Sequence, residues 1–132
     1  MPDFLIYGAT GYTGSLIAHE AVRRGYRPIL AGRTVEALAA LARKLGLEQR
    51  VFSLDDPAAV IVGLRGVSAV LHCAGPFAYT SRPMADGCLR ASVHYLDITG
   101  EVEVIEALAA RGSEAKKAGI MLLPGVGFDV VP

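Results

Sequence analysis

The sequence predicts an α/β fold, a doubly wound parallel sheet of about six strands in the order 3-2-1-4-5-6. Three observations lead to this fold class. Short apolar runs alternate with segments of helical periodicity along the 132 residues. Most of these runs lack the polar alternation of a half-exposed sheet, which indicates strands covered on both faces. A glycine-rich segment follows the first strand, where a fold of this class places its ligand crevice.

Six apolar runs, each of four to seven residues, are the candidate strands, and helical segments separate them. We expect the strands at residues 4–7, 27–31, 50–54, 67–73, 93–98 and 120–123. We expect the helices at residues 15–24, 35–45, 57–64, 83–90 and 101–118. Strands that alternate with helices in this way form a parallel, Rossmann-like sheet.

Capping and breaking residues define the ends of these elements. Thr34 caps the second helix, whose apolar residues lie three and four positions apart up to Gly46. Asp56 is followed by a proline at the first position of the third helix. A proline within residues 74–77 blocks strand pairing, so this segment is expected to be a loop. Gly112 weakens the middle of the last helix by roughly 1 kcal/mol relative to alanine.

Length, composition and charge restrict the class of protein. The chain is 52% hydrophobic and long enough for one core, so residues 1–132 are expected to form one domain. Thirteen basic and thirteen acidic side chains give a formal net charge of zero, which favours a small-molecule partner over nucleic acid or a membrane surface. Two cysteines without a CxxC pair, and no signal-like or membrane-spanning apolar run, predict a soluble cytoplasmic protein.

The segment between the first strand and the first helix, residues 8–14, is the strongest functional signal. A strand that runs through glycines into a helix turns the helix N-terminus toward a phosphate. Gly8 permits a tight turn, Gly11 lets backbone approach a pyrophosphate, and Gly14 lets the helix lie close to the sheet. The spacing is GxxGxxG and not GxGxxG, and a purely structural turn is the alternative interpretation. Further groups expected at the phosphates belong to Thr10, Tyr12 and Thr13.

The end of the second strand indicates which dinucleotide binds. An acidic residue at this position would bond the ribose hydroxyls of NAD, but the sequence has Arg33 followed by Thr34. A guanidinium there can hold the 2′-phosphate of NADP and stack on adenine. We therefore expect NADP, with a solvated surface arginine as the alternative.

Two further strand ends contribute candidate cofactor-binding residues. Asp55 follows the third strand and could accept a hydrogen bond from the adenine amino group, or could cap the next helix. Small residues after the fourth strand would let a ribose and a nicotinamide pass close to the backbone. This segment consists of Cys73, Ala74, Gly75, Pro76 and Phe77.

The remaining polar residues do not form a recognisable catalytic set. The three histidines have no ligand-like spacing, and the chain contains neither a Tyr-x-x-x-Lys pair nor a Gly-x-Ser-x-Gly motif. We therefore predict no catalytic residue and no metal site. A few polar groups near the same sheet edge are candidate substrate contacts: Asp97, Thr99, Glu101 and Asp129. The first three could, more simply, cap the next helix.

Several separated motifs together resemble one family, the N-terminal NADP-binding domain of saccharopine dehydrogenases, with its reductase-like and trans-acting enoyl reductase-like members. The motifs span nearly the whole chain and occupy residues 8–14, 31–33, 73–77, 95–101 and 124–132. The resemblance implies that the glycine segment holds the pyrophosphate, Arg33 the adenosine phosphate and residues 74–77 the nicotinamide side. It also implies hydride transfer to an imine, enoyl or similar unsaturated substrate.

Family members continue past the last of these motifs into a substrate and dimerisation domain. The resemblance thus implies that this chain is a truncated cofactor domain, with substrate bound by a domain that it lacks. Apolar residues near Pro132 also suggest a homodimer. The alternative is a stand-alone NADP-sensing or scaffold module without catalytic activity.

Overall fold

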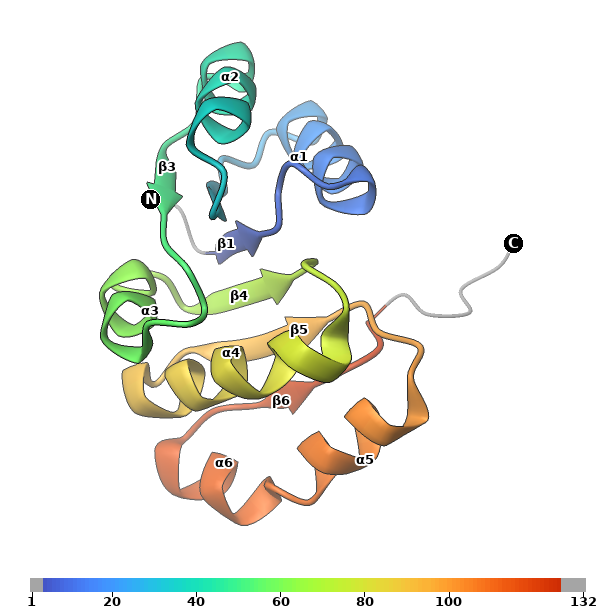
Figure 1. Ribbon diagram of the computed structural model, residues 1–132. Coiled ribbons are helices and arrows are strands. Elements are labelled where there is room, and N and C mark those ends of the chain that lie inside the picture. The colour runs from blue at the N-terminus through green and yellow to red at the C-terminus, as the bar shows by residue number, and fades with distance from the viewer. Residues whose placement is uncertain (1–3, 127–132) are drawn as a thin grey trace.

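The computed structural model of the protein describes residues 4–126, with six strands and six helices in that range (Figure 1). The strands are β1 (Phe4–Tyr7), β2 (Ile29–Gly32), β3 (Gln49–Val51), β4 (Ala69–His72), β5 (His94–Asp97) and β6 (Leu122–Leu123). The helices are α1 (Tyr12–Arg23), α2 (Val35–Leu45), α3 (Pro57–Gly63), α4 (Phe77–Ala91), α5 (Val102–Ala109) and α6 (Gly112–Ala118).

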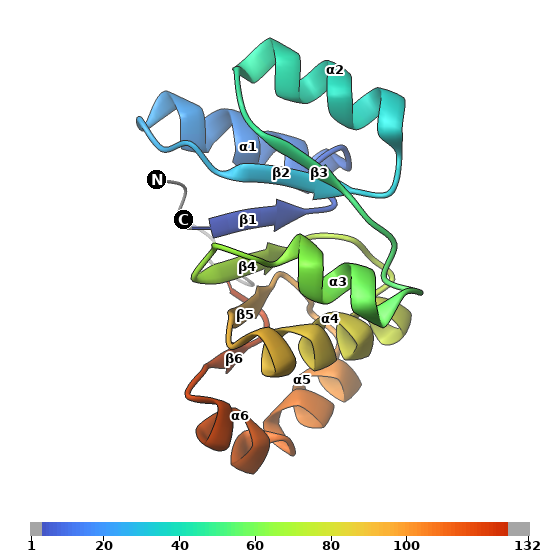
Figure 2. The ribbon, with the colours of Figure 1, turned by 90° about the vertical axis from the view of Figure 1, so that its left-hand side faces the viewer.

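The six strands form one sheet in the order β3-β2-β1-β4-β5-β6, and every pair is parallel. Both the doubly wound fold class and the strand order predicted from the sequence are confirmed. The chain leaves β1 toward β2 and later returns to β4 on its other side, so the connections diverge between β1 and β4 (Figure 2). Ligands of such sheets bind beyond the carboxyl ends of the strands at this point.

Two apolar cores lie on opposite faces of the sheet because neighbouring residues of a strand point to opposite faces. On the first face, Ile6 and Leu30 pack against α1 and α2, with Leu38 fully buried. On the second face, Leu5 and Tyr95 belong to a larger core that takes side chains from α3, α4, α5 and α6. The helices are thus divided between the two faces, as in a doubly wound domain.

The half of the first face formed by β4, β5 and β6 is less covered. Leu71 and Leu96 alternate with the buried residues of the second core, so they point to the first face, and both are only partly buried. Leu123 of β6 is paired beside Leu96 and is 44% exposed. Among residues 4–126, α1 and α2 are the helices that pack on this face, and they lie over its β1–β2 side (Figure 1).

Three helices differ from their predicted bounds. The first helix was expected from residue 15, but α1 begins three residues earlier, at Tyr12. The fourth helix was expected from Pro83, but α4 begins at Phe77 and runs through this proline. It does so because Phe77 before the proline and Met84 after it pack into the same core. The single helix expected over residues 101–118 is two helices, α5 and α6, and the second begins at Gly112, the position predicted to be weak.

Candidate cofactor site

A cavity of about 440 Å³ lies at the carboxyl ends of the four strands β3, β2, β1 and β4. Its walls come from the segments that follow these strands and from the first turn of α4. This is the crevice that the strand order places beside the divergence between β1 and β4. The lining residues are Tyr7, Gly8, Thr10, Gly11, Gly32, Arg33, Thr34, Ser53, Leu54, Asp55, Cys73, Ala74, Gly75, Pro76, Tyr79 and Thr80.

Glycine is required for close packing at two positions of the segment after β1. Gly8 has a φ of +83°, and a Cβ there would lie 2.8 Å from the backbone nitrogen of Ala74. A Cβ on Gly14 would collide with the carbonyl oxygen of Gly8. The contact with Ala74 brings the ends of β1 and β4 together, and the glycine at Gly14 lets α1 begin directly against the turn.

Gly11 differs from these two glycines. It is the N-cap residue of α1, with an ordinary φ of −72°, and it is exposed in the cavity wall. A Cβ at Gly11 would lie 3.4 Å from its nearest neighbour, the carbonyl oxygen of Gly8. The fold therefore has room for a methyl group there, and the bare backbone faces the cavity beside the positive end of the helix dipole. An anionic group of a ligand fits this cradle.

The other end of the cavity carries one positive and one negative side chain. Arg33 follows β2, is exposed, and makes no ion pair or side-chain hydrogen bond within residues 4–126. Asp56 is the N-cap of α3 and accepts a hydrogen bond from the Ala59 backbone N–H at 3.2 Å. The capping role therefore falls on Asp56, and Asp55 lines the cavity. Thr34 is the N-cap residue of α2, but its side chain makes no capping hydrogen bond.

Two titratable groups of the cavity wall are held in their neutral forms. Burial raises the pKa of Tyr7, with Arg33 lowering it and Asp55 raising it to lesser extents, and its hydroxyl donates to the Phe52 carbonyl at 2.8 Å. Burial, assisted by the negative charge of Asp97, raises the pKa of the Cys73 thiol to about 12. A thiol in this state is a poor nucleophile at neutral pH.

The cavity brings together most of the residues predicted from the sequence. Ten of them line it, and in chain order they run from Gly8 to Pro76. Four others do not line it, although they lie beside lining residues: Tyr12, Thr13, Gly14 and Phe77. Tyr12 is 84% exposed, while Phe77 packs edge-on against His72.

Sequence reasoning missed several lining residues: Tyr7, Gly32, Ser53, Leu54, Tyr79 and Thr80. The first four lie at or just after the carboxyl ends of strands, so their place at the sheet edge was the available signal. Tyr79 and Thr80 were missed because the fourth helix was expected to begin only at Pro83.

The polar residues after β5 are engaged within the protein. Asp97 is fully buried, and its carboxylate accepts hydrogen bonds from the Tyr95 hydroxyl, from the Thr99 N–H at 3.0 Å and from the Gly125 N–H at 2.9 Å. The Thr99 hydroxyl accepts from the Glu101 N–H at 3.1 Å. These groups thus support the turn before α5. The capping role expected of them is not seen, because Glu101 is the N-cap residue of α5 and makes no side-chain capping hydrogen bond. Asp129, the fourth candidate, lies outside the described residues.

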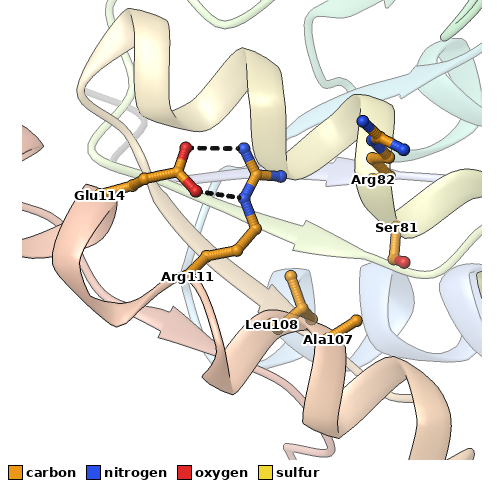
Figure 3. A pocket seen from close by; sticks show the side chains of 6 residues that line it. All are labelled: Ser81, Arg82, Ala107, Leu108, Arg111 and Glu114. Carbon is orange, nitrogen blue, oxygen red and sulfur yellow. Dashed lines mark hydrogen bonds and ion pairs between the residues drawn. The ribbon is translucent and has the colours of Figure 1, made fainter.

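A second cavity of about 440 Å³ lies among α4, α5 and α6 (Figure 3). Its main charged group, Arg111, is already paired with Glu114 at 3.0 Å and with Asp86 at 2.7 Å. None of its lining residues belongs to a segment that follows a strand. We therefore assign the ligand site to the first cavity.

The described part of the chain contains neither a candidate metal centre nor a candidate membrane-spanning helix. Within residues 4–126, no group of three or more His, Cys, Asp or Glu side chains is placed to hold a metal ion. In the same range, no helix has the length and apolar character needed to cross a membrane.

The fold and the glycine-lined cavity define a dinucleotide-binding domain of the Rossmann type. The family model described as the saccharopine dehydrogenase NADP binding domain matches residues 4–123. The chain belongs to this family, and NADP is its cofactor. The resemblance read from the sequence motifs is therefore confirmed.

Similar proteins carry related names. The human saccharopine dehydrogenase-like oxidoreductase is 24% identical over 97% of this chain and 34% of its own length. The trans-acting enoyl reductase of Mycobacterium tuberculosis is 28% identical over 98% of this chain and 33% of its own. A probable mitochondrial saccharopine dehydrogenase-like oxidoreductase of Arabidopsis thaliana is 29% identical over 98% of this chain and 32% of its own length. The chain thus spans about a third of the length of these relatives.

Solved structures share the fold. Saccharopine dehydrogenase (L-Glu forming) from Saccharomyces cerevisiae superposes with a TM-score of 0.81 at 18% identity, over 98% of this chain and 28% of that one. The Citrobacter triphenylmethane reductase, solved in complex with NADP(H), superposes with a TM-score of 0.69 at 20% identity, over 88% of this chain and 46% of that one.

Proposed function

We propose that this chain positions NADP(H) for hydride transfer as the cofactor domain of a saccharopine dehydrogenase-like oxidoreductase. The observation that carries the proposal is the continuity of the cavity, which runs from Arg33, past Gly11, to the Ala74–Pro76 segment. This path follows the strand ends in the sheet order β2, β1, β4, as an extended dinucleotide across a doubly wound sheet would require. The names of the relatives, which are oxidoreductases and a reductase, support the reaction class.

Each part of the cavity has one task in this proposal. Arg33 holds the 2′-phosphate, the backbone around Gly11 donates hydrogen bonds to the pyrophosphate, and the Ala74–Pro76 segment receives the nicotinamide half. When bound, NADPH supplies a hydride to the substrate. The protein's contribution is to hold the reactive ring in place, since neither Cys73 nor Tyr7 is ionised at neutral pH.

The assignment of Arg33 is tested by titrating the protein with NADPH and with NADH. Arg33→Ala should weaken NADPH binding by about tenfold or more, because a charge-assisted contact to a phosphate is lost, and should leave NADH binding unchanged. Arg43→Ala, which removes an exposed arginine from the last turn of α2, is the control. Equal affinity of the wild-type protein for both dinucleotides would contradict this role.

We also propose that the domain works within a longer polypeptide, which would supply the substrate site. The lengths of the relatives and the partly exposed face at Leu71, Leu96 and Leu123 support this. A reading frame extended by roughly 200 residues, about one further domain, would bear it out, while a natural stop after Pro132 would favour the stand-alone module. Sedimentation velocity tests whether the isolated chain forms the expected homodimer.

A cytoplasmic location is likewise proposed, on the two free cysteines, Cys73 and Cys88. Cell fractionation tests it, and recovery in an organelle fraction would contradict it.

A further inference from the structure

His72 is a polar residue in an apolar environment behind the cavity wall. It ends β4, is fully buried, and packs against three aromatic rings. The ring centroids lie 5.9 Å from Tyr7, 5.3 Å from Phe77 and 6.0 Å from Tyr95. A phenylalanine could make these contacts equally well. The reason for an imidazole must therefore lie in its nitrogen atoms.

The hydrogen bonds of Thr80 identify the protonated nitrogen of His72. The Thr80 hydroxyl lies 2.6 Å from the Ala74 carbonyl, 3.3 Å from the Pro76 carbonyl and 3.0 Å from His72 Nε2. A hydroxyl has one proton, and carbonyl oxygens can only accept it. Thr80 thus donates to the carbonyl of Ala74, so His72 Nε2–H must donate to Thr80.

The other ring nitrogen of His72, Nδ1, makes no hydrogen bond with the described residues. Burial lowers the pKa of His72 to about 4, although the hydrogen bond with Thr80 opposes this effect, so the ring is neutral at pH 7. With the proton on Nε2, Nδ1 is a bare acceptor, and it is buried without a hydrogen-bond partner among the described residues. An unpaired buried acceptor is costly, so the ring is tolerated here for the bond that Nε2 makes.

We propose that His72 and Thr80 are positioning residues that hold the Ala74–Pro76 segment in the geometry required for the nicotinamide half of the cofactor. The chain of hydrogen bonds runs from His72 through Thr80 to the Ala74 carbonyl, and Ala74 also touches the turn at Gly8. Neither Arg33 nor Asp55 takes part in it. The inference rests on the proposed function, because it assumes that this segment receives the nicotinamide half.

The test compares two ligands that share only the adenosine half. NADPH spans the whole cavity, whereas adenosine 2′,5′-bisphosphate carries the 2′-phosphate but no nicotinamide. Thr80→Val removes the hydroxyl at nearly constant volume, and Thr80→Ser keeps it. Thr80→Val should weaken NADPH binding by about tenfold and leave bisphosphate binding within about twofold, while Thr80→Ser should behave as wild type. The dissociation constants are measured by isothermal titration calorimetry.

Substitutions of His72 provide a second, independent test of the proposal. The amide of His72→Gln can donate where Nε2–H does, and His72→Phe keeps the ring packing without the donor. The ratio of the dissociation constants for NADPH and for the bisphosphate should stay near the wild-type value in His72→Gln. The same ratio should shift about tenfold in His72→Phe. A merely structural role would alter both ligands equally, and equal loss, or no loss, in Thr80→Val would overturn the proposal. Failure of the wild-type protein to bind the bisphosphate would instead contradict the proposed function.

Discussion

The three glycines that follow β1 differ in what a methyl group would meet. At Gly8 and Gly14 a Cβ would enter the space of neighbouring backbone, whereas at Gly11, which lines the cavity, its nearest neighbour would be the Gly8 carbonyl oxygen at 3.4 Å. The first two glycines therefore serve the fold, because they let β1, β4 and α1 approach one another. In the proposed function Gly11 serves the ligand, because a residue without a side chain would let the pyrophosphate approach the backbone.

This difference predicts opposite results for two alanine substitutions. Gly11→Ala should change the free energy of unfolding by less than about 1 kcal/mol, because its φ of −72° suits alanine, yet weaken NADPH binding by about tenfold or more. Gly14→Ala should destabilise the fold by roughly 2 kcal/mol or more, because backbone must move. Urea unfolding and NADPH titration measure the two effects. Unchanged NADPH affinity in Gly11→Ala would contradict the cradle.

Burial of His72 also makes stability depend on pH. The pKa of His72 is about 4 in the folded protein, whereas an ordinary histidine, as in the unfolded chain, has a pKa of 6.5. The unfolded state therefore binds more protons between these values, and stability falls as the pH is lowered from about 6.5 to 4. The loss attributable to this residue approaches roughly 3 kcal/mol, at ~1.4 kcal/mol per pH unit.

His72→Gln isolates this contribution, since carboxylates titrate alike in both proteins. Urea unfolding of the two proteins between pH 7 and pH 4 should give stability curves that converge as the wild type loses its advantage. Curves that stay parallel over this range would show that the histidine does not titrate with folding.

At the scale of elements, Asp97 joins β5 and the turn before α5 to the segment after β6, which is 28 residues further along the chain. Its carboxylate bonds the Tyr95 hydroxyl within β5, the Thr99 N–H before α5 and the Gly125 N–H after β6. Its own carbonyl accepts the Val126 N–H at 2.7 Å. One buried side chain thus fixes the direction in which the chain enters α5 and leaves β6.

We expect Asp97→Ala to lower the free energy of unfolding by roughly 3 kcal/mol or more. The substitution leaves two buried donors and one partly buried donor without an acceptor, and each lost bond to a charged group is worth about 1.5 to 3 kcal/mol before relaxation. Tyr95→Phe removes one of the three donors and should cost about 1.5 kcal/mol. Chemical denaturation measures both, and equal losses would argue against a shared acceptor.

The elements also show which parts of the structure the sequence could predict. Apolar runs between turns predicted where the six strands lie, because burial in a covered parallel sheet imposes a continuous apolar pattern. The glycine segment after the first strand then predicted their order. The start of α4 was not predictable in this way. Its proline suggests a helix start when local propensity alone is considered, and packing of Phe77 and Met84 into one core overrides that preference.

At the scale of the whole molecule, the position of the cofactor cavity followed from the sequence, but its walls did not. The glycine segment and the strand order together locate the crevice, since carboxyl ends of parallel strands meet at one edge. The link between His72 and Thr80 crosses from a strand to a helix and depends on rotamers that no local pattern encodes. For the same reason, the spacing of the three histidines in the sequence indicated no role for His72.

The strand order has a further consequence, for the folding of the chain. Pairing of β1 with β4 joins residues 4–7 to residues 69–72, the longest loop closure in the sheet, and such non-local contacts slow folding. The cavity is complete only after β1 has paired with β4, because its walls include residues that follow both strands. A ligand that binds only when β1 and β4 are paired stabilises the native state by mass action. The stabilisation is about 2.7 kcal/mol at a ligand concentration 100 times the dissociation constant. We therefore expect NADP, bound in the proposed site, to stabilise the folded chain, and we expect the supply of cofactor to influence the amount of folded protein in the cell.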